Sequence, residues 1–142
     1  MAYYYLATPY SNYKYGLEQA YKDAVREAAV LMSNNWQVFS PIVHSHPISL
    51  DMDNSRSYDF WIKADLPYMD HSKGIIIGDL EGWQASRGVR FEVEYFAQCR
   101  RIDPLLLLRS APLTLQILDP KTIEWEGEAA SNPIGLDIIK GK

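Results

Sequence analysis

Glu92 is the residue of this sequence best placed to do chemistry. It is flanked by Phe91, Val93, Tyr95 and Phe96, which makes it a polar residue on a strongly apolar predicted helix. A buried carboxylate costs free energy unless it is compensated, and its pKa is usually displaced from the ordinary value. Such a group is a candidate nucleophile or acid–base catalyst. The alternative is an ordinary solvated charge on a helix.

An anion site is predicted one helical turn before Glu92. Ser86 is a suitable N-cap for a helix that starts near Arg87, and Gly88 lets a ligand approach the first turn. The free backbone amides of that turn favour an anion. Because Glu92 follows Gly88 by four residues, the two lie on the same face of the helix. The alternative is that Ser86 only caps the helix.

These residues follow a short strand predicted at Gly74–Gly78. Its uninterrupted isoleucines are typical of a parallel strand that is covered on both faces. Open α/β sheets bind ligands beyond the carboxyl ends of their strands. Asp79 and Trp83 are therefore expected at the ligand-binding edge, although Trp83 could equally be a hydrophobic plug.

A second ligand-binding segment is predicted after the first strand, which spans Tyr3–Ala7 and breaks at Thr8 and Pro9. The loop at 8–13, which includes Tyr10, carries hydroxyls, an amide and aromatic rings. Such a loop suits a small polar ligand. Ordinary turn chemistry explains it equally well.

The remaining pattern predicts alternating helices and strands. Apolar residues keep a helical period from Tyr15 to about Asn34, and further elements are expected at Trp36–Ser40 (strand), Tyr58–Met69 (helix) and Leu105–Leu108 (strand). Leu113–Leu118 either forms a fifth strand or lies over the sheet. The fold class is thus α/β, a flavodoxin- or Rossmann-like three-layer sandwich with a parallel sheet of four or five strands. Residues 1–120 form one domain, and residues 121–142 are a flexible tail or an arm that packs on another subunit.

The segment 41–57 is predicted to be a long loop at the carboxyl end of the second strand. It contains His44, His46 and Asp51. These residues could line one wall of the pocket, with a histidine donating to the substrate, or could simply be polar surface. No complete set of metal ligands with a recognised spacing is present. Asp59, just after the loop, could also enter the site, whereas the other acids of the next helix are expected to be solvated.

Composition narrows the class of partner. The chain has 142 residues, a net charge of -4 and one cysteine, Cys99. A nucleic-acid partner is not expected, because neutralising phosphates requires clustered Lys and Arg. No apolar run approaches the roughly 20 residues of a membrane span, and no leader is apparent. We therefore expect a cytoplasmic protein, with Cys99 as a small core residue.

Three motifs together resemble the nucleoside 2-deoxyribosyltransferase superfamily. They are YLATPYS at Tyr5–Ser11, an acid-rich loop after the third strand, and Ser86-x-Gly88-x-x-x-Glu92. More narrowly, the chain is similar to a small uncharacterised branch that shares SP-x-x-HSHP, here Ser40–Pro47, and EGW-x-x-S-x-G-V, which begins at Glu81. The resemblance covers roughly residues 3–108.

The resemblance implies that Glu92 is the nucleophile that attacks the anomeric carbon of a sugar. A serine at position 86, where transferases of free nucleosides have an aspartate, resembles the branch that hydrolyses nucleoside 5'-monophosphates. Asp79 would orient the sugar or assist proton transfer to the base. Around the ligand, the resemblance places Tyr5, Thr8 and Tyr10 at the sugar and base, with Trp83, Trp61 or His46 stacking on the base, and Arg87 or Arg90 compensating charge. It also implies a homo-oligomer, most often a dimer, and no cofactor.

Three alternatives remain open at this point. A nucleotide-binding or sensing module of the same fold would bind monophosphates without turnover. A metal-dependent hydrolase would use His44, His46 and Asp51. An interaction protein would use its apolar helices only to build a core.

Overall fold

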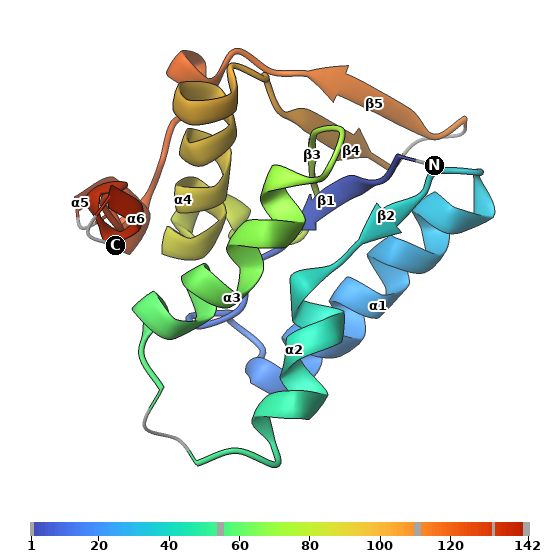
Figure 1. Ribbon diagram of the computed structural model, residues 1–142. Coiled ribbons are helices and arrows are strands. Elements are labelled where there is room, and N and C mark those ends of the chain that lie inside the picture. The colour runs from blue at the N-terminus through green and yellow to red at the C-terminus, as the bar shows by residue number, and fades with distance from the viewer. Residues whose placement is uncertain (1, 54–55, 110–111, 132, 141–142) are drawn as a thin grey trace.

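The computed structural model describes residues 2–53, 56–109, 112–131 and 133–140 (Figure 1). Its strands are β1 (Tyr4–Ala7), β2 (Val38–Phe39), β3 (Ile75–Ile77), β4 (Leu105–Leu108) and β5 (Thr114–Ile117). Its α-helices are α1 (Leu17–Ser33), α2 (Pro41–Ser49), α3 (Tyr58–Asp70), α4 (Arg87–Tyr95), α5 (Gly127–Ser131) and α6 (Asp137–Lys140). Short 3-10 turns lie at Trp83–Ala85 and Pro120–Thr122, and a π-helical turn, Phe96–Arg100, continues α4. Among these described residues, no helix combines the length and apolar character needed to cross a membrane.

The strands form one sheet in the order β2-β1-β3-β4-β5. The first four are parallel, so the predicted α/β fold is confirmed. Leu113–Leu118, which the sequence left undecided, contains the edge strand β5, and this strand runs antiparallel to β4. Because β2, β1 and β3 are parallel neighbours, their carboxyl ends meet at one edge of the sheet. The segments that follow them are therefore brought together.

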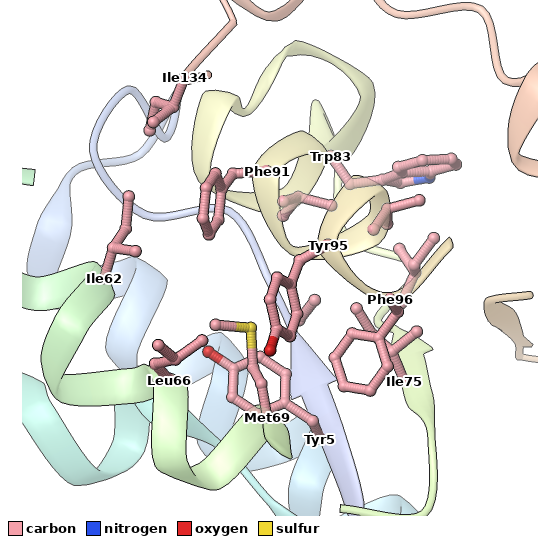
Figure 2. Close-up of a cluster of buried hydrophobic side chains, with 14 residues drawn as sticks. Tyr5, Ile62, Leu66, Met69, Ile75, Trp83, Phe91, Tyr95, Phe96 and Ile134 are labelled. Carbon is pink, nitrogen blue, oxygen red and sulfur yellow. The ribbon is translucent and has the colours of Figure 1, made fainter. Parts of the chain in front are cut away.

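Alternation along the strands divides the core between the two faces of the sheet. Tyr5 and Ala7 pack with α3 and α4, whereas Leu6 packs with Leu31 of α1 on the opposite face. The molecule is thus a three-layer sandwich. Figure 2 shows the larger cluster, in which Tyr5 meets side chains of α3 and α4.

The helix α2 corrects the prediction of a long loop at 41–57. Ser40 caps this helix by accepting a hydrogen bond of 3.1 Å from the backbone N–H of Val43, and Pro41 takes the first helical turn, where its missing N–H costs nothing. Pro47 inside the helix disguised the pattern, because proline normally breaks a helix. This helix directs His46 inward, where its side chain is buried.

The segment after Pro120 packs on its own chain. Ala129 and Ile134 are buried, and Ile134 belongs to the same cluster as the α3 and α4 side chains (Figure 2). Arg90 of α4 donates a hydrogen bond of 2.6 Å to the backbone carbonyl of Ala129. The sequence did not reveal this packing, because the segment mixes turn-forming residues with scattered apolar ones.

Gly78 allows close packing at the carboxyl edge of the sheet. A Cβ at this position would lie 2.9 Å from Cγ2 of Thr8 and 3.0 Å from Oε1 of Glu27. Glu27 is fully buried on α1 and forms an ion pair with Arg109, which follows β4. The absence of a side chain at position 78 therefore lets β1, β3 and α1 approach one another.

Candidate functional site

A cavity of about 520 Å³ opens at the carboxyl edge of the sheet. Its walls come from the loop after β1, from α2 and α3, and from the start of α4; Ile134 of the C-terminal segment closes part of the rim. This volume lies within the range of sites for small organic ligands. The position agrees with the rule that open α/β sheets bind ligands beyond their carboxyl ends.

Glu92 projects from α4 into this cavity. The hydroxyl of Tyr5, at the centre of β1, donates a hydrogen bond of 2.5 Å to Oε2 of Glu92. Burial raises the pKa of Glu92 to about 8; the hydrogen bond from Tyr5 opposes that shift, and the negative charge of Asp65 adds to it. Burial also raises the pKa of Tyr5 well above its usual value, so the phenol remains a donor. A carboxylate with a displaced pKa in a cavity is a candidate catalytic group.

Asp65 of α3 is a second carboxyl group in the same cavity. Burial raises its pKa to about 7. From the sequence, Asp65 was expected to be solvated, and Asp59 was the acid of this helix predicted to enter the site. The helical spacing of the buried residues Ile62, Leu66 and Met69 was the signal that could have found it, because Asp65 falls on that inward face.

Asp65 and Glu92 influence one another, since the charge of Asp65 raises the pKa of Glu92. With values of about 7 and about 8, the pair retains at least one proton through most of the neutral range. A pair of this kind can supply one ionised carboxylate and one protonated acid at the same time. That combination serves reactions in which a nucleophile attacks while a leaving group is protonated.

The amino end of α4 forms a third part of the cavity. The hydroxyl oxygen of Ser86 accepts a hydrogen bond of 3.2 Å from the backbone N–H of Val89, as the capping prediction requires. Space is open above Gly88, where an added Cβ would meet only the Ser86 hydroxyl, at 3.9 Å. Backbone amides there are accessible to an anion.

Arg87 adds a positive charge at this end of the cavity. Its guanidinium lies over the ring of Tyr58 at 4.9 Å, and its buried Nε has no hydrogen-bond partner within the described part of the chain. Leaving a buried hydrogen-bond donor without a partner costs free energy, so a ligand atom that accepts a hydrogen bond from this Nε would bind favourably here. Arg90 has a different role, because it pairs with Glu94 and with the C-terminal segment.

Other predicted ligand-binding residues also reach the cavity. Thr8 is buried at its wall, and its Oγ1 makes no hydrogen bond to any described residue. Tyr10 and His46 line the same wall and contact each other. Pro9 lines only a smaller neighbouring pocket of about 210 Å³.

Besides Pro9, five predicted site residues do not line the cavity. Tyr5 is fully buried and is linked to it only through its hydrogen bond to Glu92, and the other four lie elsewhere. Asp79 is exposed beyond β3 and does not line the cavity. Trp83 packs against Trp125 in the core, so it acts as the hydrophobic plug that the sequence offered as an alternative. His44 packs its ring against Phe39 and Tyr68. Asp59 pairs with Lys63 on the surface of α3.

The residues considered for a metal do not assemble. Asp51 is exposed, His44 points away from the cavity, and both ring nitrogens of His46 have hydrogen-bond partners. Over residues 2–53, 56–109, 112–131 and 133–140, no group of three or more His, Cys, Asp or Glu side chains has an arrangement that could hold a metal ion.

Sequence reasoning also missed several cavity residues. Arg56, Ser57 and Tyr58 bring a cation and two hydroxyls from the segment that enters α3, and Ile134 comes from the C-terminal segment. Ser57 is the N-cap of α3, which was a detectable signal for the start of this helix but not for the direction of its side chains. No local pattern indicates that Ile134 reaches the cavity.

Comparison with known proteins identifies the family. A family model described as "Domain of unknown function (DUF1937)" matches residues 2–103, and the chain belongs to this family. The match includes β1 to β3 and α1 to α4, and hence every candidate catalytic and anion-binding residue described above. No curated protein matches the chain.

Proposed function

We propose that this member of the DUF1937 family is an N-glycosidase that cleaves the bond between base and sugar in nucleoside 5'-monophosphates. The observation that carries the proposal is the arrangement along α4. Its amino end offers amides and Arg87 to a phosphate, and Glu92 follows Gly88 by about 6 Å along the helix axis in the same cavity. The motif resemblance to the nucleoside 2-deoxyribosyltransferase superfamily supports the same chemistry.

The proposed reaction begins from the singly protonated form of the pair whose proton is on Asp65. This is the less populated of the two forms, because the pKa of Glu92, about 8, is higher than that of Asp65, about 7. Ionised Glu92, held by the Tyr5 hydroxyl, attacks the anomeric carbon while the bond from that carbon to the base nitrogen breaks. Asp65 gives its proton to the departing base. Asp65 then takes a proton from water, whose oxygen attacks the anomeric carbon and releases Glu92. A second base in place of water would give a transferase.

The Ser86 hydroxyl explains the preference for a phosphorylated substrate. A carboxylate at this position would repel a phosphate, whereas a hydroxyl beside free amides accepts it. Arg87 compensates the charge of the phosphate. Free nucleosides would lack these interactions and are expected to be poor substrates.

The test is base release from a panel of nucleosides and their 5'-monophosphates, followed by chromatography. We expect release from monophosphates, its loss in Glu92→Gln, and retained monophosphate binding by that variant. Glu94→Gln is the matched control, because Glu94 lies on the same helix but pairs with Arg90 outside the cavity. A clear preference for unphosphorylated nucleosides would refute the proposal.

A second candidate is a nucleotide-binding module without turnover. It is favoured by the raised pKa of Glu92, about 8, because a protonated carboxyl group is a hydrogen-bond donor rather than a nucleophile at neutral pH. Saturable binding of monophosphates without release of base from any of them would support this module.

We also expect a homo-oligomer, and light scattering measures the oligomeric state directly.

A further inference from the structure

His46 on α2 is buried and uses both of its ring nitrogens. Nδ1 lies 2.7 Å from the hydroxyl oxygen of Tyr10, and Nε2 lies 3.0 Å from Oε1 of Glu18 on α1. The ring stacks on Tyr21 with centroids 4.7 Å apart and an interplanar angle of 22°. The Glu18–His46–Tyr10 chain is thus a hydrogen-bonded series from an exposed carboxylate to the cavity wall, and the proposed reaction does not use it.

For an ionised Glu18 and a neutral His46, the hydrogens of the three groups have one consistent arrangement. An ionised carboxylate only accepts hydrogen bonds, so the Nε2–H of His46 donates to Glu18. A neutral imidazole has one N–H, and Nδ1 must then accept a hydrogen bond from the Tyr10 hydroxyl. Burial raises the pKa of Tyr10, against the effect of a hydrogen bond with the Ser49 side chain, so the phenol keeps its hydrogen.

The hydrogen-bonding role of the Tyr10 hydroxyl at the cavity wall is therefore fixed. Since the only hydroxyl hydrogen of Tyr10 is directed at His46, the Tyr10 oxygen can only accept a further hydrogen bond. Tyr10 and His46 both line the cavity. A ligand group beside Tyr10 is therefore favoured if it carries an N–H or O–H donor.

The sheet order indicates which part of the substrate meets Tyr10. The anion site and Glu92 both lie on α4, which follows β3, whereas α2 follows β2 on the other side of β1. With phosphate and anomeric carbon placed at α4, the base occupies the rest of the cavity, between Asp65 of α3 on one side and the loop after β1 with α2 on the other. Tyr10 is then beside the edge of the base.

We infer that the Glu18–His46–Tyr10 chain makes this enzyme selective for nucleotides whose base carries an exocyclic amino group, by holding Tyr10 as an acceptor for that amine. This inference rests on the proposed function and goes beyond it by naming the substrate class. Tyr10 would be a specificity-determining residue, and His46 and Glu18 positioning residues that act through it.

The test measures affinity in the Glu92→Gln background, where substrates bind without turnover. Titration calorimetry would compare two matched pairs, cytidine with uridine 5'-monophosphate and adenosine with inosine 5'-monophosphate. We expect the amino member of each pair to bind roughly 3- to 10-fold more tightly, as one neutral hydrogen bond allows. Tyr10→Phe should remove this preference, whereas the control Tyr15→Phe should keep it, because the Tyr15 hydroxyl bonds Glu81 outside the cavity.

A second variant tests the positioning role. In Glu18→Gln the side-chain amide can donate to Nε2, which lets the hydrogen move to Nδ1 and turns the Tyr10 hydroxyl toward the cavity as a donor. The preference should then shift toward the keto member of each pair. Nitrogen chemical shifts of His46 report the tautomer directly: we expect a protonated Nε2 in the parent protein and a protonated Nδ1 in this variant.

The outcomes separate this inference from the proposed function. If no monophosphate binds, the proposed function and this inference both fail. If monophosphates bind but Tyr10→Phe weakens the binding of all of them equally, only the amino-base inference fails. The same holds if the effect of Tyr10→Phe on affinity depends on whether the sugar is ribose or deoxyribose and not on the base. A protonated Nδ1 in the parent protein would also overturn it.

Discussion

The hydroxyl of Tyr5 donates a hydrogen bond of 2.5 Å to the carboxylate of Glu92, across the boundary between β1 and α4. The bond joins a residue at the centre of the sheet to the group with the most displaced carboxyl pKa in the cavity. It favours the ionised form of Glu92 against the effect of burial. The ionisation of Glu92 thus depends on a residue of the sheet as well as on the helix that carries it.

Tyr5→Phe should move the pH dependence of turnover. Without the hydroxyl, the pKa of Glu92 rises further. The limb of the bell-shaped pH–rate profile that reports Glu92 should therefore move to a pH higher by about one unit, as expected for one hydrogen bond to a charged group, and the maximum of kcat/KM should fall because less of the enzyme has Glu92 ionised while Asp65 is protonated. A pH–rate profile measures the midpoint. Tyr3→Phe is the control, because the Tyr3 hydroxyl donates to the backbone carbonyl of Tyr68 instead. Equal midpoints in all three proteins would contradict the assigned role of Tyr5.

Stability should fall as the pH rises through the neutral range. A carboxyl group whose pKa is raised in the folded state binds a proton on folding, so its contribution is complete below the unfolded pKa and is lost as the pH rises through the folded pKa. For Glu92 and Asp65 this window runs from about 4 to about 8. The free energy of unfolding of Glu92→Gln should therefore equal that of the parent protein near pH 4. At pH 8 it should exceed that of the parent protein by on the order of 1–3 kcal/mol.

Thermal unfolding of both proteins at pH 4, 6 and 8 measures this difference. Glu124→Gln, at an exposed position, should show no such trend. A stability difference that stays constant across the three pH values would show that Glu92 is not protonated on folding.

Arg87→Gln should weaken phosphate recognition specifically. A charge-assisted hydrogen bond contributes roughly 1.5–3 kcal/mol, so monophosphate affinity should fall by about 10-fold or more while nucleoside affinity is unchanged. Calorimetric titration at two salt concentrations measures both. Arg90→Gln should instead reduce stability through the lost contact with Ala129 and leave the affinity ratio intact. Equal losses of affinity for nucleoside and monophosphate would show that Arg87 does not belong to the anion site.

Ile134→Ala should affect both stability and binding. Ile134 is buried in the main core cluster and also lines the cavity, so truncation should cost about 2–4 kcal/mol of unfolding free energy and raise KM. Urea denaturation and steady-state kinetics measure the two effects. Ile117→Ala is the matched control at a position that is 69% exposed, where little change is expected. Similar stability of the two variants would mean that the C-terminal segment does not complete the core.

The fold was predictable where a pattern repeats along one element. The isoleucines of β3 and the helical period of α1 each carry their signal locally, and the structure confirms both. The helix α2 was missed because its cap at Ser40 and its internal Pro47 give conflicting local signals. Tertiary packing decides such cases, because the burial of His46 against α1 stabilises the helix.

The candidate site was predictable where one helix carries it. Gly88 and Glu92 share a face of α4 by their spacing, Ser86 caps the same helix, and the structure brings all three to the cavity. Asp65 was missed in favour of Asp59 because the choice between two acids of one helix depends on how α3 is rotated against the sheet. That rotation is set by contacts distant in sequence.

Gly78 limits which substitutions the cavity wall at Thr8 can tolerate. A side chain at position 78 would press on Thr8, which lines the cavity, and on the buried Glu27, so the packing behind Thr8 tolerates little variation. The walls formed by α2 and α3 carry no such constraint, because their cavity-facing side chains project from helices. New substrate preferences should therefore arise by substitutions on those helices, and selection experiments that randomise Ser45, Ser49 and Trp61 would sample the variable half of the site.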